Sequence, residues 1–256
     1  MSLFNKVLAS IGIGNAQVDT QLEKSTFTAG EILRGNVIIQ GGNVAQEIGQ
    51  INLALKTKYL SEVNDSKFHQ DGIICSFVIS ESFTIEAGER KEIPFDFRLP
   101  FLTPITAGQS QVWLHTGLDI SLAVDPTDED YIRVNPSPLV SSVLNAVEGL
   151  GFRLHTVENE KPSHKLGTNA AFIQEFEYRA TGEFRRYLDE LEITFIRHSE
   201  SELTFVMQVD RRARGLGGLF AEALEMDETY VRVRVTPNDI PNMRQIVDST
   251  IRRYMK

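Results

Sequence analysis

Strict alternation of apolar and polar residues over long segments is the feature that most constrains this fold. Between Ile51 and Tyr59 the odd positions hold Ile, Leu, Leu, Thr and Tyr, and the even positions hold Asn, Ala, Lys and Lys. Successive side chains of a β-strand point to opposite faces, so this period of two predicts a half-buried strand. The pattern recurs at 73–79, 93–99 and 112–124, and no segment between them is helical enough for a parallel α/β fold. Residues 1–125 are therefore expected to form an antiparallel β-sandwich.

The alternation stops at an acidic segment, Asp125–Asp130, in which the second residue is Pro126. We interpret this segment as a solvated linker between two domains, because the ligand spacing and central glycine of a calcium-binding loop are missing. A helix is predicted over 138–149, since Ser137 can cap it, Pro138 suits its first turn and an apolar stripe follows. The helix thus lies close to the predicted domain junction.

Strand-like alternation resumes after this helix, at 152–157, 172–178, 191–196, 203–209 and 230–236. These spacings predict a second β-sandwich over 126–237, with the helix inserted near 138–149. The expected fold class is all-β with a few short helices. A length of 256 residues agrees with two domains, each large enough to bury its own core.

The last segment, 238–256, is predicted to be an amphipathic helix. Its apolar residues recur at helical spacing, with basic residues near the C-terminal end, where they suit the helix dipole. Two interpretations are open: the stripe packs on its own domain, or it binds in the groove of a partner protein. The stripe consists of Met243, Ile246, Val247, Ile251 and Tyr254.

Charge and cysteine content restrict the compartment and the partners. The chain has 26 Lys and Arg against 35 Asp and Glu, a net charge of −9, which disfavours nucleic acid as a partner. Cys75 is the single cysteine, so an internal disulfide and a cysteine-based metal site are excluded. No apolar run is long enough for a membrane span, and the first residues lack the apolar core of a signal peptide. We expect a cytoplasmic protein.

Motifs that would indicate catalysis, a metal or a cofactor are missing from the sequence. There is no HExxH or GxSxG motif, and a phosphate-binding loop is excluded because the dipeptide Gly-Lys does not occur. The histidines show no metal-ligand spacing and are interpreted as surface residues. We expect no catalytic residue, cofactor or metal site. The histidines are His69, His115, His155, His164 and His198.

One basic segment rich in glycine allows two interpretations. A helix that starts near Leu219 would bring backbone N–H groups and three arginines close together, which suits a phosphate or a carboxylate. Alternatively, the segment is a glycine-rich hinge whose arginines pair with nearby acidic residues. The residues of this candidate contact site are Arg211, Arg212, Arg214, Gly215, Gly217 and Gly218.

Two segments, 27–37 and 93–100, resemble the strand–turn motifs of arrestin-type domains. Gly30 permits a tight turn, Gly35 permits a close backbone approach, and Pro94 indicates an edge strand. With residues 4–16, residues 211–228 and the overall length, the chain resembles the bacterial sporulation-control family named for the stage-zero M locus.

This resemblance implies two arrestin-like, immunoglobulin-like β-sandwiches and no catalytic activity. It further implies a regulatory or adaptor role in sporulation control, or in cell-division and cytoskeletal processes, with self-association as a homodimer left open. Our first hypothesis is a cytoplasmic adaptor that binds other proteins through sheet edges and an exposed helix. The alternatives are an anion- or small-ligand-binding β-sandwich that uses residues 211–218, and an enzyme whose site residues are scattered over several strands.

Overall fold

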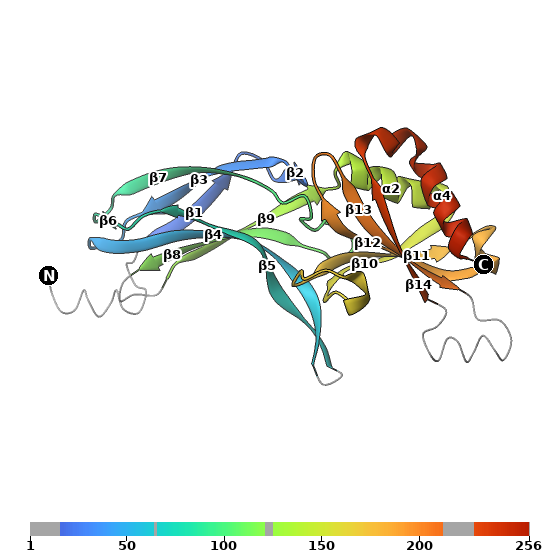
Figure 1. The fold of residues 1–256 in the computed structure, drawn as a ribbon. Helices are drawn as coiled ribbons and strands as arrows, with labels where there is room; N and C mark the ends of the chain where they lie inside the picture. Colours follow the sequence, from blue (N-terminus) through green and yellow to red (C-terminus); the bar gives the residue numbers. More distant parts are fainter. Residues whose placement is uncertain (1–15, 64–65, 121–124, 212–227, 256) are drawn as a thin grey trace.

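The computed structural model describes residues 16–63, 66–120, 125–211 and 228–255, and it consists mostly of strands (Figure 1). Within these ranges the first half of the chain contains nine strands. They are β1 (Gln17–Leu22), β2 (Thr26–Thr28), β3 (Ile32–Gln40), β4 (Gln46–Val63), β5 (Ser66–Ser80), β6 (Phe83–Ile85), β7 (Arg90–Arg98), β8 (Val112–Ile120) and β9 (Thr127–Asn135). The alternating segments of the sequence thus form strands, as predicted.

The first half is a sandwich of two sheets. One sheet has the order β1-β3-β7, and the other contains β4, β8, β9 and β2, with β5 and β6 paired to β4. Their facing side chains form one core, to which Leu33 and Val37 contribute from β3 and Leu53 and Leu55 from β4. The apolar set of each alternating segment therefore lies between the sheets, where its removal from water stabilises the fold.

Three residues of the arrestin-type segments have the roles predicted for them. Gly30 has a φ of +89°, and a Cβ there would lie 2.3 Å from the ring of Phe101. A Cβ on Gly35 would lie 2.6 Å from the carbonyl oxygen of Gln21 on β1. Pro94 lies in β7, which is the edge strand of its sheet. Both glycines are thus required by close approach, and the proline occupies a position that needs no ladder N–H.

The interpretation of Asp125–Asp130 as a linker is wrong, because most of this segment belongs to a strand. β9 pairs antiparallel with β8 and parallel with β2, and its Ile132 and Val134 lie in the first core. The carboxylate of Asp128 accepts a hydrogen bond of 2.7 Å from the backbone N–H of Thr20. The acidic side chains lie outside the core, and the apolar residues after them continue the alternation. The high local charge indicated a solvated loop, and the start of the strand was therefore not predicted.

The second half contains one antiparallel sheet, β10-β11-β12-β13-β14, with two helices packed on one of its faces (Figure 1). Its elements are α2 (Pro138–Gly149), β10 (Phe152–Glu160), β11 (Ile173–Ala180), β12 (Leu188–His198), β13 (Leu203–Arg211), β14 (Glu228–Val235) and α4 (Met243–Tyr254). Short 3₁₀ helices are η1 (His164–Leu166), η2 (Phe184–Arg186) and η3 (Pro237–Asn242). Where a second sandwich was expected, the layer that faces this sheet is helical in the described residues, because both helices bury an apolar stripe.

Both predicted helices are present, and both pack on the sheet of the second half. α2 begins after Ser137, whose hydroxyl accepts the N–H of Val140 at 3.3 Å, as expected for an N-cap. The C-terminal helix starts later than predicted, because Pro237 and Pro241 lie in η3 and α4 begins at Met243. No helix in the described ranges is long and apolar enough to cross a bilayer.

The two halves share one continuous sheet. The distal part of β4 meets β10 in a parallel arrangement, with Leu60 opposite Glu160. The sheet therefore runs in the order β14-β13-β12-β11-β10-β4-β8-β9-β2 through both halves, although each half has its own hydrophobic core. The place where the two cores meet is the part of the molecule that the sequence did not reveal.

Candidate functional site

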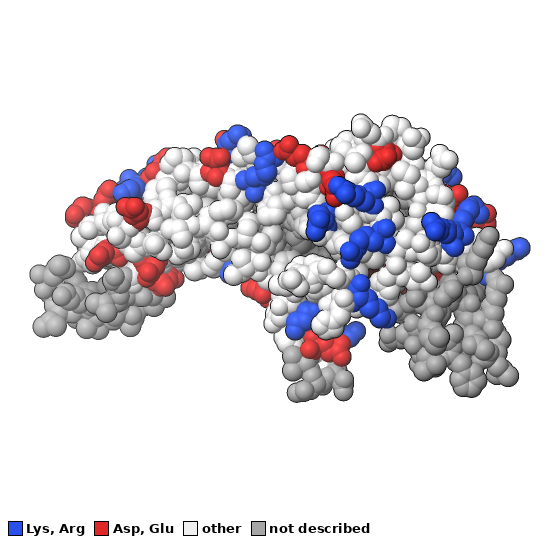
Figure 2. Space-filling model, in the orientation of Figure 1, with Lys and Arg blue, Asp and Glu red and all other residues white. Residues whose placement is uncertain are grey.

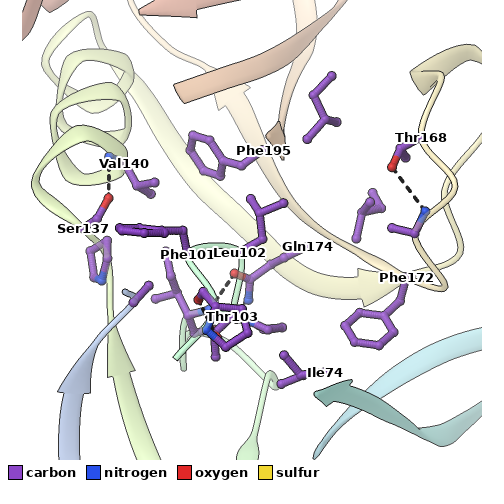
Figure 3. Close-up of a pocket in the computed structure, with 18 of the residues that line it drawn as sticks. Ile74, Phe101, Leu102, Thr103, Ser137, Val140, Thr168, Phe172, Gln174 and Phe195 are labelled. Atoms are coloured by element: carbon purple, nitrogen blue, oxygen red, sulfur yellow. Dashed lines mark hydrogen bonds between the residues drawn. The ribbon is translucent and has the colours of Figure 1, made fainter. Parts of the chain in front are cut away.

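A cavity of about 280 Å³ lies at the junction of the two halves (Figure 3). Its walls come from the middle of β5, the loop between β7 and β8, the loop before β11, the start of α2, and β12. No lining side chain is charged, and most are apolar. The lining includes Ile73, Ile74, Phe101, Leu102, Ile105, Val140, Phe172 and Phe195. Its volume is close to the lower end of the range for small-ligand pockets, about 300–1,000 Å³.

Phe101 holds the loop between β7 and β8 against the second half. Its ring packs over Gly30, and its centroid lies 4.9 Å from that of the His198 imidazole at the end of β12. Pro100 follows the last residues of β7, and its carbonyl accepts a 2.7 Å hydrogen bond from the Thr103 hydroxyl. Contacts within the first half therefore fix the conformation of this loop, and Phe101 extends from it to the second half.

The polar side chains that line the cavity are already hydrogen-bonded within the protein. Gln174 on β11 accepts the N–H of Ile105 at 2.8 Å and donates to the Ile105 carbonyl at 2.7 Å. The Thr168 hydroxyl accepts the N–H of Ala170 at 3.2 Å. Because these groups are satisfied, the cavity favours an apolar occupant over a polar one.

A buried amide joins the two halves at a second place on the junction. Asn159 on β10 is 2% exposed, and its Nδ2 lies 2.9 Å from Thr57 Oγ1, 2.9 Å from the Lys58 carbonyl and 3.0 Å from Ser110 Oγ. The acceptors belong to the first half, so these hydrogen bonds cross the junction. At the surface, Arg98 and Glu200 form a further contact across it at 3.2 Å.

A serine and a histidine lie together at the rim, and their surroundings assign them a structural role. Ser137 Oγ is 2.7 Å from His198 Nε2, and His198 Nδ1 is 3.2 Å from the carbonyl of Glu202. Burial lowers the pKa of His198, so the imidazole is neutral at pH 7. The third group is a backbone carbonyl rather than a carboxylate, and the serine is the buried N-cap of α2 (Figure 3). This arrangement stabilises the start of the helix.

The sheet face opposite the helices carries a row of glutamates. Glu160 and Glu175 lie on the adjacent strands β10 and β11, with Glu177 and Glu192 opposite each other on β11 and β12. Burial, together with neighbouring carboxylates, raises the pKa of Glu175 to about 9, and burial raises the pKa of Glu160. Within the described residues, no group of three or more His, Cys, Asp or Glu side chains is arranged to hold a metal ion.

The candidate residues from the sequence lie elsewhere. The anion segment lies outside the described residues, except that the backbone of Arg211 ends β13. The stripe of the C-terminal helix packs on its own domain, which is one of the two interpretations left open: Met243, Val247 and Ile251 are buried in the second core, and Ile246 and Tyr254 pack against it. Three histidines lie within ion-pair distance of glutamates: His69 is 3.0 Å from Glu158, His115 is 3.5 Å from Glu129 and His155 is 3.9 Å from Glu177. The one available signal for the junction was a loop with apolar residues between two prolines, 100–104.

Fold and site together define a class: a β-rich protein with two cores and an uncharged cavity where they meet. The sequence profile of the SpoOM protein family matches residues 4–213, and the chain belongs to this family. It is 41% identical to the "Sporulation-control protein spo0M" of Bacillus subtilis (strain 168) over 247 residues, which are 96% of this chain and 95% of that protein. The crystal structure of that organism's Spo0M matches with a TM-score of 0.84 and 38% identity, over 94% of this chain and all of the other. The likeness of each half to an arrestin domain stays a prediction.

Proposed function

We propose that this chain is a non-catalytic cytoplasmic regulator in the control of sporulation, and that it acts as an adaptor by binding other proteins. The observation that carries the proposal is the 41% sequence identity, over 96% of this chain, to a protein named for sporulation control. Cell-division or cytoskeletal processes are the alternative setting of the same adaptor role.

The junction agrees with binding rather than catalysis. Its cavity is uncharged, its polar groups are already hydrogen-bonded, and its Ser–His pair caps a helix. Catalytic sites concentrate ionisable groups with a free nucleophile or base, whereas an apolar recess next to an open sheet edge suits recognition of a peptide.

The first test is a crosslinked pull-down from a lysate of the native organism, with the folded full-length chain as bait. The control bait is an unrelated β-sandwich protein of similar size and net charge. We expect a small set of proteins to be enriched on the full chain alone. An identical protein set on both baits would contradict the adaptor role.

The second test is genetic. In a sporulating native organism, deletion of the gene should change the frequency of heat-resistant spores, and the intact gene should restore it. An unchanged frequency with normal sporulation markers would remove sporulation control from the proposal, and the pull-down would still test adaptor activity.

A further inference from the structure

β5 is a long edge strand whose residues 72–80 lack the charges and prolines that usually protect an edge, while its register against β4 shifts at Ile74 and Ile79. It extends over Ser66–Ser80 and, among the described strands, pairs only with β4. Residues 72–80 contain neither a charged residue nor a proline, and Ile73 and Val78 are 59% and 56% exposed. Natural edge strands are normally short, charged or interrupted by proline, because free backbone N–H and C=O groups attract another strand.

Two other edge strands, β7 and β14, do carry charged residues or proline. β7 carries Pro94 and five charged residues within nine positions, and β14 carries Arg232 and Arg234. In Figure 2, Lys and Arg gather over the second half, and much of the surface beside them is uncharged. The absence of charge on residues 72–80 is therefore a property of this edge and not of the sheets in general.

The free edge of β5 borders the junction cavity. Ile73 and Ile74 both line it, and Phe172 covers Gly72 from the other side of the junction, stacked on Tyr59 with centroids 5.3 Å apart. A strand added to β5 would lie about 4.8 Å away, within reach of the cavity for a large side chain. Because the lining is uncharged and internally hydrogen-bonded, that side chain has to be apolar.

The partly buried side chain of Lys56 lies in register with Ile73. Tyr131, Trp113, Lys56 and Ile73 form one rung across β9, β8, β4 and β5. Lys56 forms no ion pair with any described residue. A strand added at Ile73 would extend this rung at about 9.6 Å from β4, which is twice the strand spacing, and the side chains of Lys56 and of a glutamate on the added strand together span that distance.

We infer that the outer edge of β5 receives an extended segment of a partner protein, which adds to the sheet as a further strand, places an aromatic or branched aliphatic side chain in the junction cavity and pairs an acidic side chain with Lys56. This inference rests on the proposed adaptor function and names the surface and the chemistry of its partner. Main-chain hydrogen bonds supply affinity in this mode, and the cavity and the lysine supply specificity.

The test selects peptides from a display library of random nonapeptides on the full-length chain, and measures their affinities by fluorescence anisotropy. We expect enriched peptides that lack a central proline and combine a large apolar residue with Asp or Glu. Ile73→Lys and Lys56→Glu should each weaken binding about tenfold or more, while Leu154→Lys, at an exposed apolar position of β10 that does not line the cavity, should leave it unchanged. Methylation of a central peptide nitrogen, which removes a ladder donor, should also weaken binding.

Circular dichroism and thermal unfolding first establish that each variant is folded, and Val78→Lys replaces Ile73→Lys if the latter is not. Hydrogen exchange gives an independent measurement: backbone amides of β5 should become protected when a selected peptide binds. Equal affinity for the wild type and the edge variants, no enriched peptide, or protection of β5 that depends only on protein concentration, as for a second copy, would each overturn the inference.

The pull-down separates this inference from the proposed function. If the Ile73→Lys bait retains every partner of the wild type, the adaptor role stands and the β5 site is wrong. If the wild type captures no specific partner, the adaptor role itself fails.

Discussion

Two buried polar side chains in the second half differ in the hydrogen bonds that they form. The Nδ2 of Asn159 lies among three acceptors at the junction, although its Oδ1 has no hydrogen-bond partner among the described residues, and neither has the hydroxyl of Tyr178 on β11. Burial raises the pKa of Tyr178, so the hydroxyl is protonated and its desolvation is uncompensated. The Nδ2 of Asn159 therefore stabilises the fold through its hydrogen bonds across the junction, whereas the Tyr178 hydroxyl contributes none.

This difference predicts opposite effects of two substitutions. Tyr178→Phe keeps the ring and should leave the free energy of unfolding unchanged or raise it by up to about 1 kcal/mol. Asn159→Ala leaves buried acceptors without a donor and should lower it by about 1–3 kcal/mol. Urea unfolding followed by circular dichroism measures both, and a loss of stability in Tyr178→Phe would mean that its hydroxyl has a partner after all.

Among the elements, α4 is the one whose role changes most between sequence and structure. An apolar stripe near a chain end is equally consistent with a partner groove and with the domain's own core. Here Ile251 is fully buried beside α2, while Arg253 lies on the exposed side of the same helix. The helix is thus part of the second core, and its stripe is not available to a partner while the domain is folded.

Substitution by aspartate at these two positions tests that placement. Ile251→Asp would bury an unpaired charge and should lower the free energy of unfolding by about 3 kcal/mol or more, whereas Arg253→Asp should change it by less than about 1 kcal/mol. The comparison uses the same helix and the same introduced residue. Two variants of equal stability would show that α4 does not cover the core.

What the sequence could predict depends on where each element's signal lies. α2 was predictable because Ser137, Pro138 and the stripe are neighbours in the chain, and β7 because Pro94 marks an edge. β9 was missed because Asp128 and Asp130 suggest a solvated loop, although their strand pairs along its length. The cavity was not predictable, since contacts such as that between Asn159 and Thr57 join residues 102 positions apart and leave no local pattern.

At the scale of the whole molecule, the carboxyl pair Glu160–Glu175 couples pH to stability close to the contact between β4 and β10. Glu160 is the residue of β10 that faces Leu60 of β4. The pKa of Glu175 is raised from an ordinary value of 4.5 to about 9, first by burial and then by neighbouring carboxylates. The folded protein therefore holds a proton that the unfolded chain has lost throughout this interval.

Because the folded state binds the extra proton, the free energy of unfolding should fall as the pH rises from about 4.5 to about 9, by at most about 1.4 kcal/mol per pH unit. Glu175→Gln cannot ionise and should remove most of this slope, with higher stability than the wild type at about pH 8.5. Urea unfolding at about pH 6 and about pH 8.5 measures the slope. Glu62→Gln, at an exposed position of β4, is the matched control and should keep the slope of the wild type.

The length of β4 also determines how the molecule would respond to tension. This strand pairs with β5 along most of its length, but in the described residues its ladder pairing with β10 is limited to Leu60 and Glu160. A force that draws the halves apart acts on that one rung and on the side-chain contacts across the junction, including those of Asn159, Gln174 and Arg98. Under tension, the contacts between the two halves should therefore break first. The strands of the first sandwich, β4 included, should stay paired until a higher force is reached.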